Sequence, residues 1–319
     1  MLPWKSLLCR QNINLLIIIS YHRPFVSASF FLRFLSFPVI LKSKRNEGGI
    51  SLKIIDAHIH YCPKKPYFDT IAREAGHENT ESHLLREFKR LGIEHAVVMG
   101  NQTLDSDAAS FPESLSWCVG IDERFFTEET PSWWYDRTER LLASKACVGI
   151  KLYPGYSHHY ITDKKYEPIY ELAEFFHKPV AVHTGATAGT GAMLKYSHPL
   201  IVDEAAVRFP GVRFVLCHLG NPWITDAAAV LDKNENVTAD LSGILEGNPS
   251  MDQFLKDKAG YLSHIRTWLE YLDRYDKLMY GTDWPLANME GYIAFTMSLI
   301  PEKKWDQVFY ENARRIYGL

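Results

Sequence analysis

Short apolar segments alternate with longer amphipathic segments from residue 52 to the end of the chain. The apolar segments are rich in β-branched residues, which is typical of strands that are buried on both faces. Eight such segments predict strands: Leu52–Ala57, Ala96–Met99, Ser116–Ile121, Val148–Leu152, Val180–His183, Arg213–His218, Val237–Leu241 and Leu278–Gly281. The segments between and after them predict helices: Glu81–Leu91, Trp134–Ser144, Tyr166–Phe176, Pro199–Phe209, Thr225–Asn234, Ser263–Tyr275 and Trp305–Tyr317.

Eight strand–helix units over about 250 residues predict a (β/α)8 TIM barrel. Gly92 and Gly211 directly follow predicted helices, at positions where a left-handed residue often ends a helix. The alternative is an open doubly wound sheet, which would typically carry a glycine-rich loop after an early strand. Here the first predicted strand instead runs into His58-Ile59-His60, which favours the barrel.

The first 51 residues lack a sustained period and predict a separate N-terminal extension. A signal peptide would have only the short apolar core Leu15–Ile19, and Arg23 follows closely. A membrane span is discounted because Arg23 and Arg33 leave no run of about 18 apolar residues. We favour a third interpretation, in which the extension is not native. A ribosome-binding sequence could encode Glu47-Gly48-Gly49 ahead of a misread start at Leu52. We expect the catalytic fold to span residues 52–319 and the extension to lie outside it.

Composition limits the kinds of molecule that the protein is expected to bind. The chain has 35 basic and 38 acidic residues and a formal net charge of -3, so no strong field draws nucleic acid or an anionic membrane. Its five cysteines show no CxxC spacing, which fits reduced thiols in a cytoplasmic protein better than a disulfide framework. We therefore expect a cytoplasmic protein whose partner is a small molecule.

Histidines and an aspartate stand at the ends of the predicted strands, where the barrel fold places catalytic residues. His58 and His60 are two positions apart on one strand, so both imidazoles point to the same side. His183, His218 and Asp283 end three further strands. A lone histidine near a strand end is more often a hydrogen-bonded structural residue than a ligand. Their joint placement favours a metal site, and imidazole with carboxylate suits zinc or another divalent transition metal, such as manganese.

Six segments carry a resemblance to a known family. They are Ile55–His60, Gly149–Pro154, Val182–Gly185, Cys217–Gly220, Asp240–Gly243 and Gly281–Pro285. With the ending Asn312–Tyr317, they resemble the amidohydrolase superfamily, in particular the branch of aminocarboxymuconate-semialdehyde decarboxylase and related metal-dependent hydrolases. The resemblance covers residues 52–319.

The resemblance implies roles for individual residues. His58, His60 and His183 would bind the metal, with Asp283 as a further ligand or proton acceptor. His218 would act beside the metal as general base or acid. A homodimer is also an expectation from the resemblance.

The expected activity is hydrolysis, through metal-activated water, of a lactone, amide or ester in a small carboxylated substrate. The alternative is a non-oxidative decarboxylase or hydratase on the same site, because fold and ligands do not choose between these reactions. A non-enzymatic binding barrel would be expected to lack Asp283 or part of the His58–His60 pair, and both are present.

Lys151, which ends the fourth predicted strand, leaves two interpretations open. In binuclear relatives a lysine at this strand is carboxylated and bridges two metals. In the mononuclear branch, which the surrounding Gly149–Pro154 resembles more, it would bind a substrate carboxylate or an internal acid, so one ion is favoured over two. Tyr153, Arg124 and Trp284 are the other predicted substrate contacts, and the loop Gly185–His198 is a predicted lid.

Overall fold

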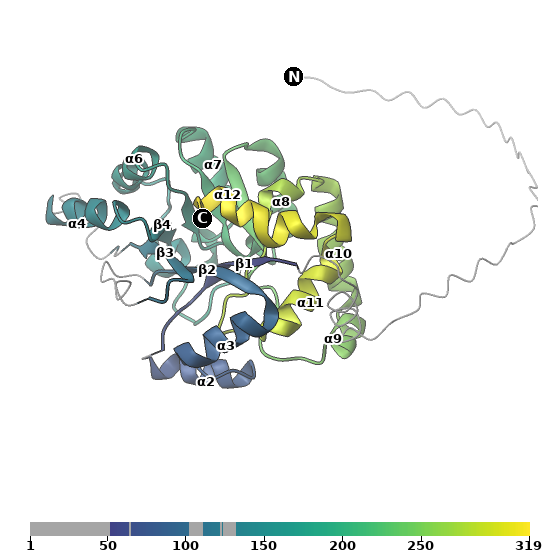
Figure 1. Ribbon diagram of the computed structural model, residues 1–319. Coiled ribbons are helices and arrows are strands. Elements are labelled where there is room, and N and C mark those ends of the chain that lie inside the picture. The colour runs from purple at the N-terminus through teal and green to yellow at the C-terminus, as the bar shows by residue number, and fades with distance from the viewer. Residues whose placement is uncertain (1–51, 64, 102–110, 122, 124–131) are drawn as a thin grey trace, which may run out of the picture. The chain divides into compact units, whose positions relative to one another are not determined.

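The computed structural model describes residues 52–63, 65–101, 111–121, 123 and 132–319. The predicted N-terminal extension and Arg124 lie outside these residues. Among the described residues, eight strands form one parallel sheet in the order β1 to β8 (Figure 1). The strands are β1 (Ile54–Ile59), β2 (Ile93–Met99), β3 (Leu115–Gly120), β4 (Cys147–Leu152), β5 (Val180–Val182), β6 (Phe214–Leu216), β7 (Val237–Asp240) and β8 (Leu278–Met279). All eight predicted strands are confirmed, with shifted ends.

Backbone hydrogen bonds between the first and last strands nearly close the barrel. The Ala57 amide donates to the Tyr280 carbonyl at 2.9 Å, and the Asp283 amide donates to the His58 carbonyl at 2.9 Å. Ile59 and Trp284 form a parallel bridge further along. This seam therefore brings the two ends of the catalytic domain, with their histidine and aspartate motifs, side by side.

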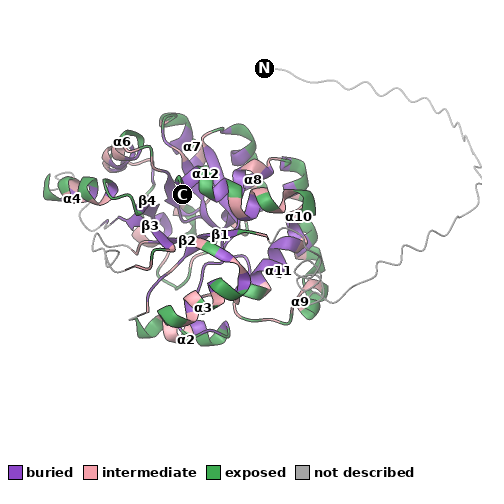
Figure 2. Cartoon of the chain, in the orientation of Figure 1, coloured by how far each residue is buried: buried purple, intermediate pink, exposed green. Residues whose placement is uncertain are grey.

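Helices surround the strands, and their outer faces are exposed while the strands are buried (Figures 1 and 2). The helices are α2 (Pro66–Glu74), α3 (Glu81–Leu91), α4 (Ser132–Leu142), α5 (Pro154–Ser157), α6 (Glu167–Phe175), α7 (Leu200–Arg208), α8 (Ile224–Lys233), α9 (Met251–Asp257), α10 (Ala259–Leu272), α11 (Met289–Leu299) and α12 (Asn312–Tyr317). Helix α3 shows why these segments are helical. The Thr80 side chain accepts a hydrogen bond from the His83 amide at its start, and Gly92 with φ 80° ends it.

Several details differ from the sequence-based expectations, and the helices α2, α5, α9 and α11 were not predicted. Gly211 does not have a positive φ; a Cβ there would lie 2.0 Å from Glu174 Oε1, so the position needs space rather than a left-handed backbone. The segment predicted as one helix over Trp305–Tyr317 includes a π-helical turn, Gln307–Glu311, before α12. Helix α11 was missed because it is buried almost all round, so no polar face reveals its period.

The C-terminal helix α12 lies against the interior of the barrel. Its residues Ala313, Ile316 and Tyr317 pack with Val215 and Met279, which belong to the strands. This packing gives the barrel a closed hydrophobic interior. Among the described residues, no helix has the length and apolar character that crossing a bilayer requires.

Candidate metal centre

The structure brings together the four predicted histidines and Asp283 at the C-terminal ends of their strands. The ring centroids of His58 and His218 are 4.8 Å apart, and those of His183 and His218 are also 4.8 Å apart. The His58 and His60 rings meet edge to face at 5.6 Å. His60 Nε2 lies 3.3 Å from Asp283 Oδ1. Residues from β1 and from the segments after β5, β6 and β8 thus converge on one buried place.

Two members of the cluster have strained backbones. His218 has φ 64° and Asp283 has φ 60°, and both residues are buried. A left-handed non-glycine residue costs on the order of 1–3 kcal/mol and persists only where the surrounding structure fixes it. Such strain is concentrated at functional sites, and here it directs both side chains toward the other histidines.

His58 is held in one tautomer. Its Nδ1 is 2.9 Å from Asp240 Oδ2, and both side chains are fully buried. Burial tends to raise the pKa of Asp240, but His58, His218 and the hydrogen bonds to the carboxylate hold that pKa well below its usual range. Burial lowers the pKa of His58 despite the attraction of Asp240. Burial therefore favours the neutral form of His58, which donates from Nδ1 to the Asp240 carboxylate and carries a lone pair on Nε2.

That lone pair faces a carboxylate oxygen. His58 Nε2 is 3.5 Å from Asp283 Oδ1, and both atoms are buried without a hydrogen-bond partner in the described structure. Burial tends to raise the pKa of Asp283, but the close contact with His60, whose Nε2 lies 3.3 Å from Oδ1, and the attraction of the other histidines hold that pKa well below its usual range. Two acceptors thus face one another, an arrangement that a cation between them would stabilise.

A second pair of acceptors lies beside the first. The Ser242 hydroxyl donates to Asp240 Oδ1 at 2.5 Å and therefore accepts from His218 Nδ1 at 2.9 Å. His183 Nε2 lies 3.0 Å from the Ala186 carbonyl, to which it donates. The lone pairs of His218 Nε2 and His183 Nδ1 then face each other at 3.1 Å. Burial lowers the pKa of His218 to about 4 and that of His183 well below its ordinary value, so neither imidazole supplies a further proton.

These contacts fit a divalent cation. The ligand atoms of His58, His60 and Asp283 all lie within 4.8 Å of one another. Imidazole nitrogens with one carboxylate oxygen are the donor set that zinc and related transition metals take. The orphaned Nε2 of His58 and Oδ1 of Asp283 are the atoms that such an ion would satisfy.

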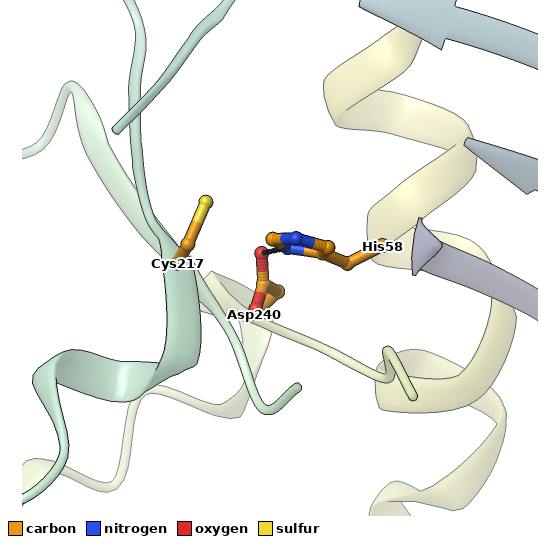
Figure 3. Close-up of side chains that lie close together, drawn as sticks. All are labelled: His58, Cys217 and Asp240. Carbon is orange, nitrogen blue, oxygen red and sulfur yellow. Dashed lines mark hydrogen bonds and ion pairs between the residues drawn. The ribbon is translucent and has the colours of Figure 1, made fainter. Parts of the chain in front are cut away.

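A second group with metal-ligand chemistry, His58, Cys217 and Asp240, shares His58 and is fully buried (Figure 3). Here the His58 Nδ1 and Asp240 Oδ2 atoms already share a hydrogen bond, drawn as a dashed line in Figure 3. The Lys151 amine donates to Cys217 Sγ at 2.9 Å. Since these atoms satisfy one another, we interpret this group as support for the candidate metal centre.

The structure also places three of the four predicted substrate contacts. Lys151 is fully buried with its Nζ 5.0 Å from the Tyr153 ring centroid. The Tyr153 hydroxyl donates to the Gly100 carbonyl, and its ring stacks on His183 at 6.2 Å. The Trp284 side chain is fully buried, and its Nε1 has no hydrogen-bond partner in the described structure. Arg124 lies outside the described residues.

The predicted lid loop Gly185–His198 lies beside the centre and contacts α5. The Ala188 amide donates to the Tyr156 hydroxyl at 2.8 Å, and the Met193 amide donates to the Gly155 carbonyl at 2.8 Å. The Tyr156 ring meets the His183 ring edge to face at 5.1 Å. The loop therefore packs next to a predicted ligand, and its movement stays a prediction.

Sequence reasoning assigned no role to two residues that organise the centre, Asp240 and Ser242. Both are fully buried at the end of β7. Asp240 Oδ1 accepts hydrogen bonds from the His218 amide, the Ser242 amide and the Ser242 hydroxyl. The sequence did indicate them, because Asp240 and Ser242 are two positions apart at the end of a predicted strand, where the other site residues also lie.

Comparison with known proteins gives one family match. The family model described as amidohydrolase matches residues 55–319. No functionally curated sequence matches the chain.

Several solved structures share the fold. An amidohydrolase from Burkholderia multivorans with bound zinc is 16% identical, with a TM-score of 0.59, and the match covers 84% of this chain and 99% of that one. The 5-carboxyvanillate decarboxylase from Novosphingobium aromaticivorans, complexed with manganese, is 11% identical, with a TM-score of 0.58 and coverage of 84% and 96%. A probable 2-pyrone-4,6-dicarboxylic acid hydrolase from Acinetobacter baumannii is 12% identical, with a TM-score of 0.54 and coverage of 85% and 100%.

Proposed function

We propose that this chain, which belongs to the amidohydrolase family, is a metal-dependent hydrolase of a small carboxylated lactone, amide or ester. The observation that carries the proposal is the buried contact between His58 Nε2 and Asp283 Oδ1, two acceptors that lie 3.5 Å apart without other hydrogen-bond partners. A structural histidine would instead present an N–H to the carboxylate. The arrangement is the one expected of ligands.

We assign His58, His60, His183 and Asp283 as the residues that hold the ion. When bound, a divalent ion supplies Lewis acidity and lowers the pKa of water toward about 7. Zinc or manganese is proposed because structural neighbours contain these metals. One ion is favoured over two because the Lys151 amine donates a hydrogen bond to Cys217 Sγ. In a site with two ions, this amine would instead be carboxylated and would bridge the two metals.

The chain's own residues supply the proton chemistry. His218 presents a lone pair on Nε2 toward the centre, because its Nδ1 proton is held by the Ser242 hydroxyl. It is thus placed to accept a proton as general base. The proton that His218 accepts can then pass to the leaving group, either directly from His218 or by way of the Asp283 carboxylate, which the surrounding histidines hold ionised and which can therefore accept it first. Burial of all these groups excludes bulk water and strengthens their electrostatic effect on the reacting atoms.

A carboxylated substrate is proposed because the Lys151 amine lies beside the Tyr153 ring, which in turn stacks on His183. Cations hold carboxylates through charge-assisted hydrogen bonds. Neighbouring structures are named for reactions of carboxylic acids, one a hydrolysis and one a decarboxylation. The second candidate is therefore a non-oxidative decarboxylase on the same residues.

The test combines metal content with product analysis. Elemental mass spectrometry of the purified chain and of Lys151→Met should give about one equivalent in both. Lys277→Met is a matched control, since Lys277 is also buried but donates to the Leu231 and Asn234 carbonyls away from the centre. Two equivalents that fall only in Lys151→Met would indicate a carboxylated lysine and two ions.

The reaction class is then read from the products. Zinc- and manganese-loaded protein is incubated with carboxylated lactones, amides, esters and aromatic carboxylic acids. Hydrolysis without gas release supports the first candidate, whereas release of CO2 supports the second. A folded protein that takes up neither metal would contradict both.

A further inference from the structure

The two oxygens of Asp240 serve different partners. Oδ2 faces the side chain of His58, with 2.9 Å between Oδ2 and Nδ1. Oδ1 accepts from the His218 amide at 2.9 Å, the Ser242 amide at 3.2 Å and the Ser242 hydroxyl at 2.5 Å. Because the carboxylate is fully buried and every contact is to a donor, its orientation is fixed.

Ser242 extends this control to a second imidazole. Its hydroxyl has one proton, and that proton goes to the Asp240 carboxylate, which only accepts. The hydroxyl oxygen must then accept from His218 Nδ1, 2.9 Å away. The chain of contacts from Asp240 therefore determines which nitrogen carries the proton in both His58 and His218.

We propose that Asp240 and Ser242 are positioning residues that fix both imidazoles as Nδ1–H tautomers, so that the Nε2 lone pairs of His58 and His218 face the candidate metal centre. The consequence for metal binding rests on the proposed function, but the tautomers themselves do not. One carboxylate thus sets up a ligand and a general base together, although it touches neither ion nor substrate.

Replacement of Asp240 by asparagine should reverse the tautomer of His58. The backbone amides of His218 and Ser242 cannot reverse, so the asparagine must keep its oxygen toward them. Its NH2 group then faces His58 Nδ1, which has to accept. The His58 proton moves to Nε2, where it can bond to Asp283 Oδ1, and the lone pair that a metal would use is lost.

Asp56 offers a matched control. It is also a fully buried carboxylate beside the centre, and it accepts from the His58 amide, the Thr282 amide and the Thr282 hydroxyl. Among the described residues, its hydrogen bonds go to backbone amides and a hydroxyl and not to an imidazole nitrogen. Burial raises the pKa of Asp56 to about 7, so Asp56→Asn matches the change of a buried carboxyl group to an amide without the change of tautomer.

The experiment reads the tautomers directly. Long-range proton–nitrogen spectra of the imidazoles are recorded for metal-free protein above the ordinary histidine pKa of about 6.5, with assignment by single histidine variants. The wild type should show protons on Nδ1 of His58 and His218. Asp240→Asn should move the His58 proton to Nε2, Ser242→Ala should change His218 alone, and Asp56→Asn should change neither.

Metal affinity provides the second readout, measured as the dissociation constant for Zn²⁺ by competition with a chelator. Asp240→Asn should bind about 10- to 100-fold more weakly than wild type. Lys277→Met, a buried change away from the centre, should bind as wild type does. An Nε2–H tautomer of His58 in wild type, or an unchanged tautomer in folded Asp240→Asn, would overturn the proposal. If Asp240→Asn does not fold, the spectra of wild type and of Ser242→Ala still test whether the two imidazoles are Nδ1–H tautomers. Wild type that shows the tautomers but no metal uptake would refute the proposed function alone.

Discussion

Gly243 supports the centre by having no side chain, and Gly243→Ala tests how tightly the centre is packed. A Cβ there would lie 2.5 Å from His218 Nδ1 and 3.2 Å from Asp283 Oδ2. The His218 ring has little room to retreat, because Ser242 holds its Nδ1 at 2.9 Å and His183 faces its Nε2 at 3.1 Å. The contact must open by roughly half an ångström to reach 3.0 Å, below which real Cβ atoms essentially never occur.

Gly247→Ala separates this clash from backbone strain. Gly243 has φ +62° and Gly247 has φ +70°, so an alanine at either position takes a left-handed backbone at a cost of about 1–2 kcal/mol. At Gly247 the added Cβ meets its nearest atom, the Glu74 carbonyl oxygen, at 3.8 Å, which is ordinary contact. Only Gly243→Ala adds overpacking, for a further cost of about 1–3 kcal/mol.

The assay compares urea unfolding and Zn²⁺ affinity for the two variants. Gly243→Ala should lose more stability than Gly247→Ala and bind Zn²⁺ about 10- to 100-fold more weakly, because His218 and Asp283 are displaced. Gly247→Ala should bind as wild type does. Equal stability and equal affinity in the two variants would refute the packing argument, since they differ in what the new Cβ meets.

Three further predictions follow from other contacts. Burial lowers the pKa of His77 to about 4, so the unfolded chain binds a proton at His77 that the folded chain does not bind. From pH 6.5 to 4 the loss of stability in urea titrations should therefore be about 3 kcal/mol smaller in His77→Gln than in wild type, and an equal loss in both proteins would contradict this. Thr80→Ala removes the helix cap on the His83 amide and should cost about 1 kcal/mol, with Ser263→Ala, at an exposed position of α10, as the control; equal costs would count against the cap. Asp283→Ala should abolish Zn²⁺ uptake in dialysis, and undiminished uptake would remove Asp283 from the proposed ligands.

The strands were predictable because each is a short apolar run between amphipathic helices. β4, Cys147–Leu152, is buried at every position, and this continuous burial is visible in the sequence. α11 was not predictable for the same reason, since a helix buried on all sides lacks the alternation that marks a helix. Gly211 looked like a helix terminator, whereas its place beside Glu174 depends on a contact that the local sequence does not contain.

The order of the strands was enough to predict which residues meet in the candidate site. The barrel rule collects strand-end residues at one face, and His58, His60, His183, His218 and Asp283 do lie together there. Their protonation was not predictable, because it depends on which nitrogen each neighbour contacts. Asp240 and Ser242 determine which nitrogen of His58 and His218 is protonated, and this follows only from the distances between the atoms.

The closure of the barrel and the geometry of the site have the same origin. Asp56 accepts from the His58 amide on β1 and from the Thr282 amide and hydroxyl after β8, so it links the two ends of the sheet. The Asp283 amide donates to the His58 carbonyl across the same seam. These backbone contacts set the distance between the two side chains that carry the orphaned acceptor atoms. Substitutions that loosen the seam should therefore weaken metal binding even where no proposed ligand is changed.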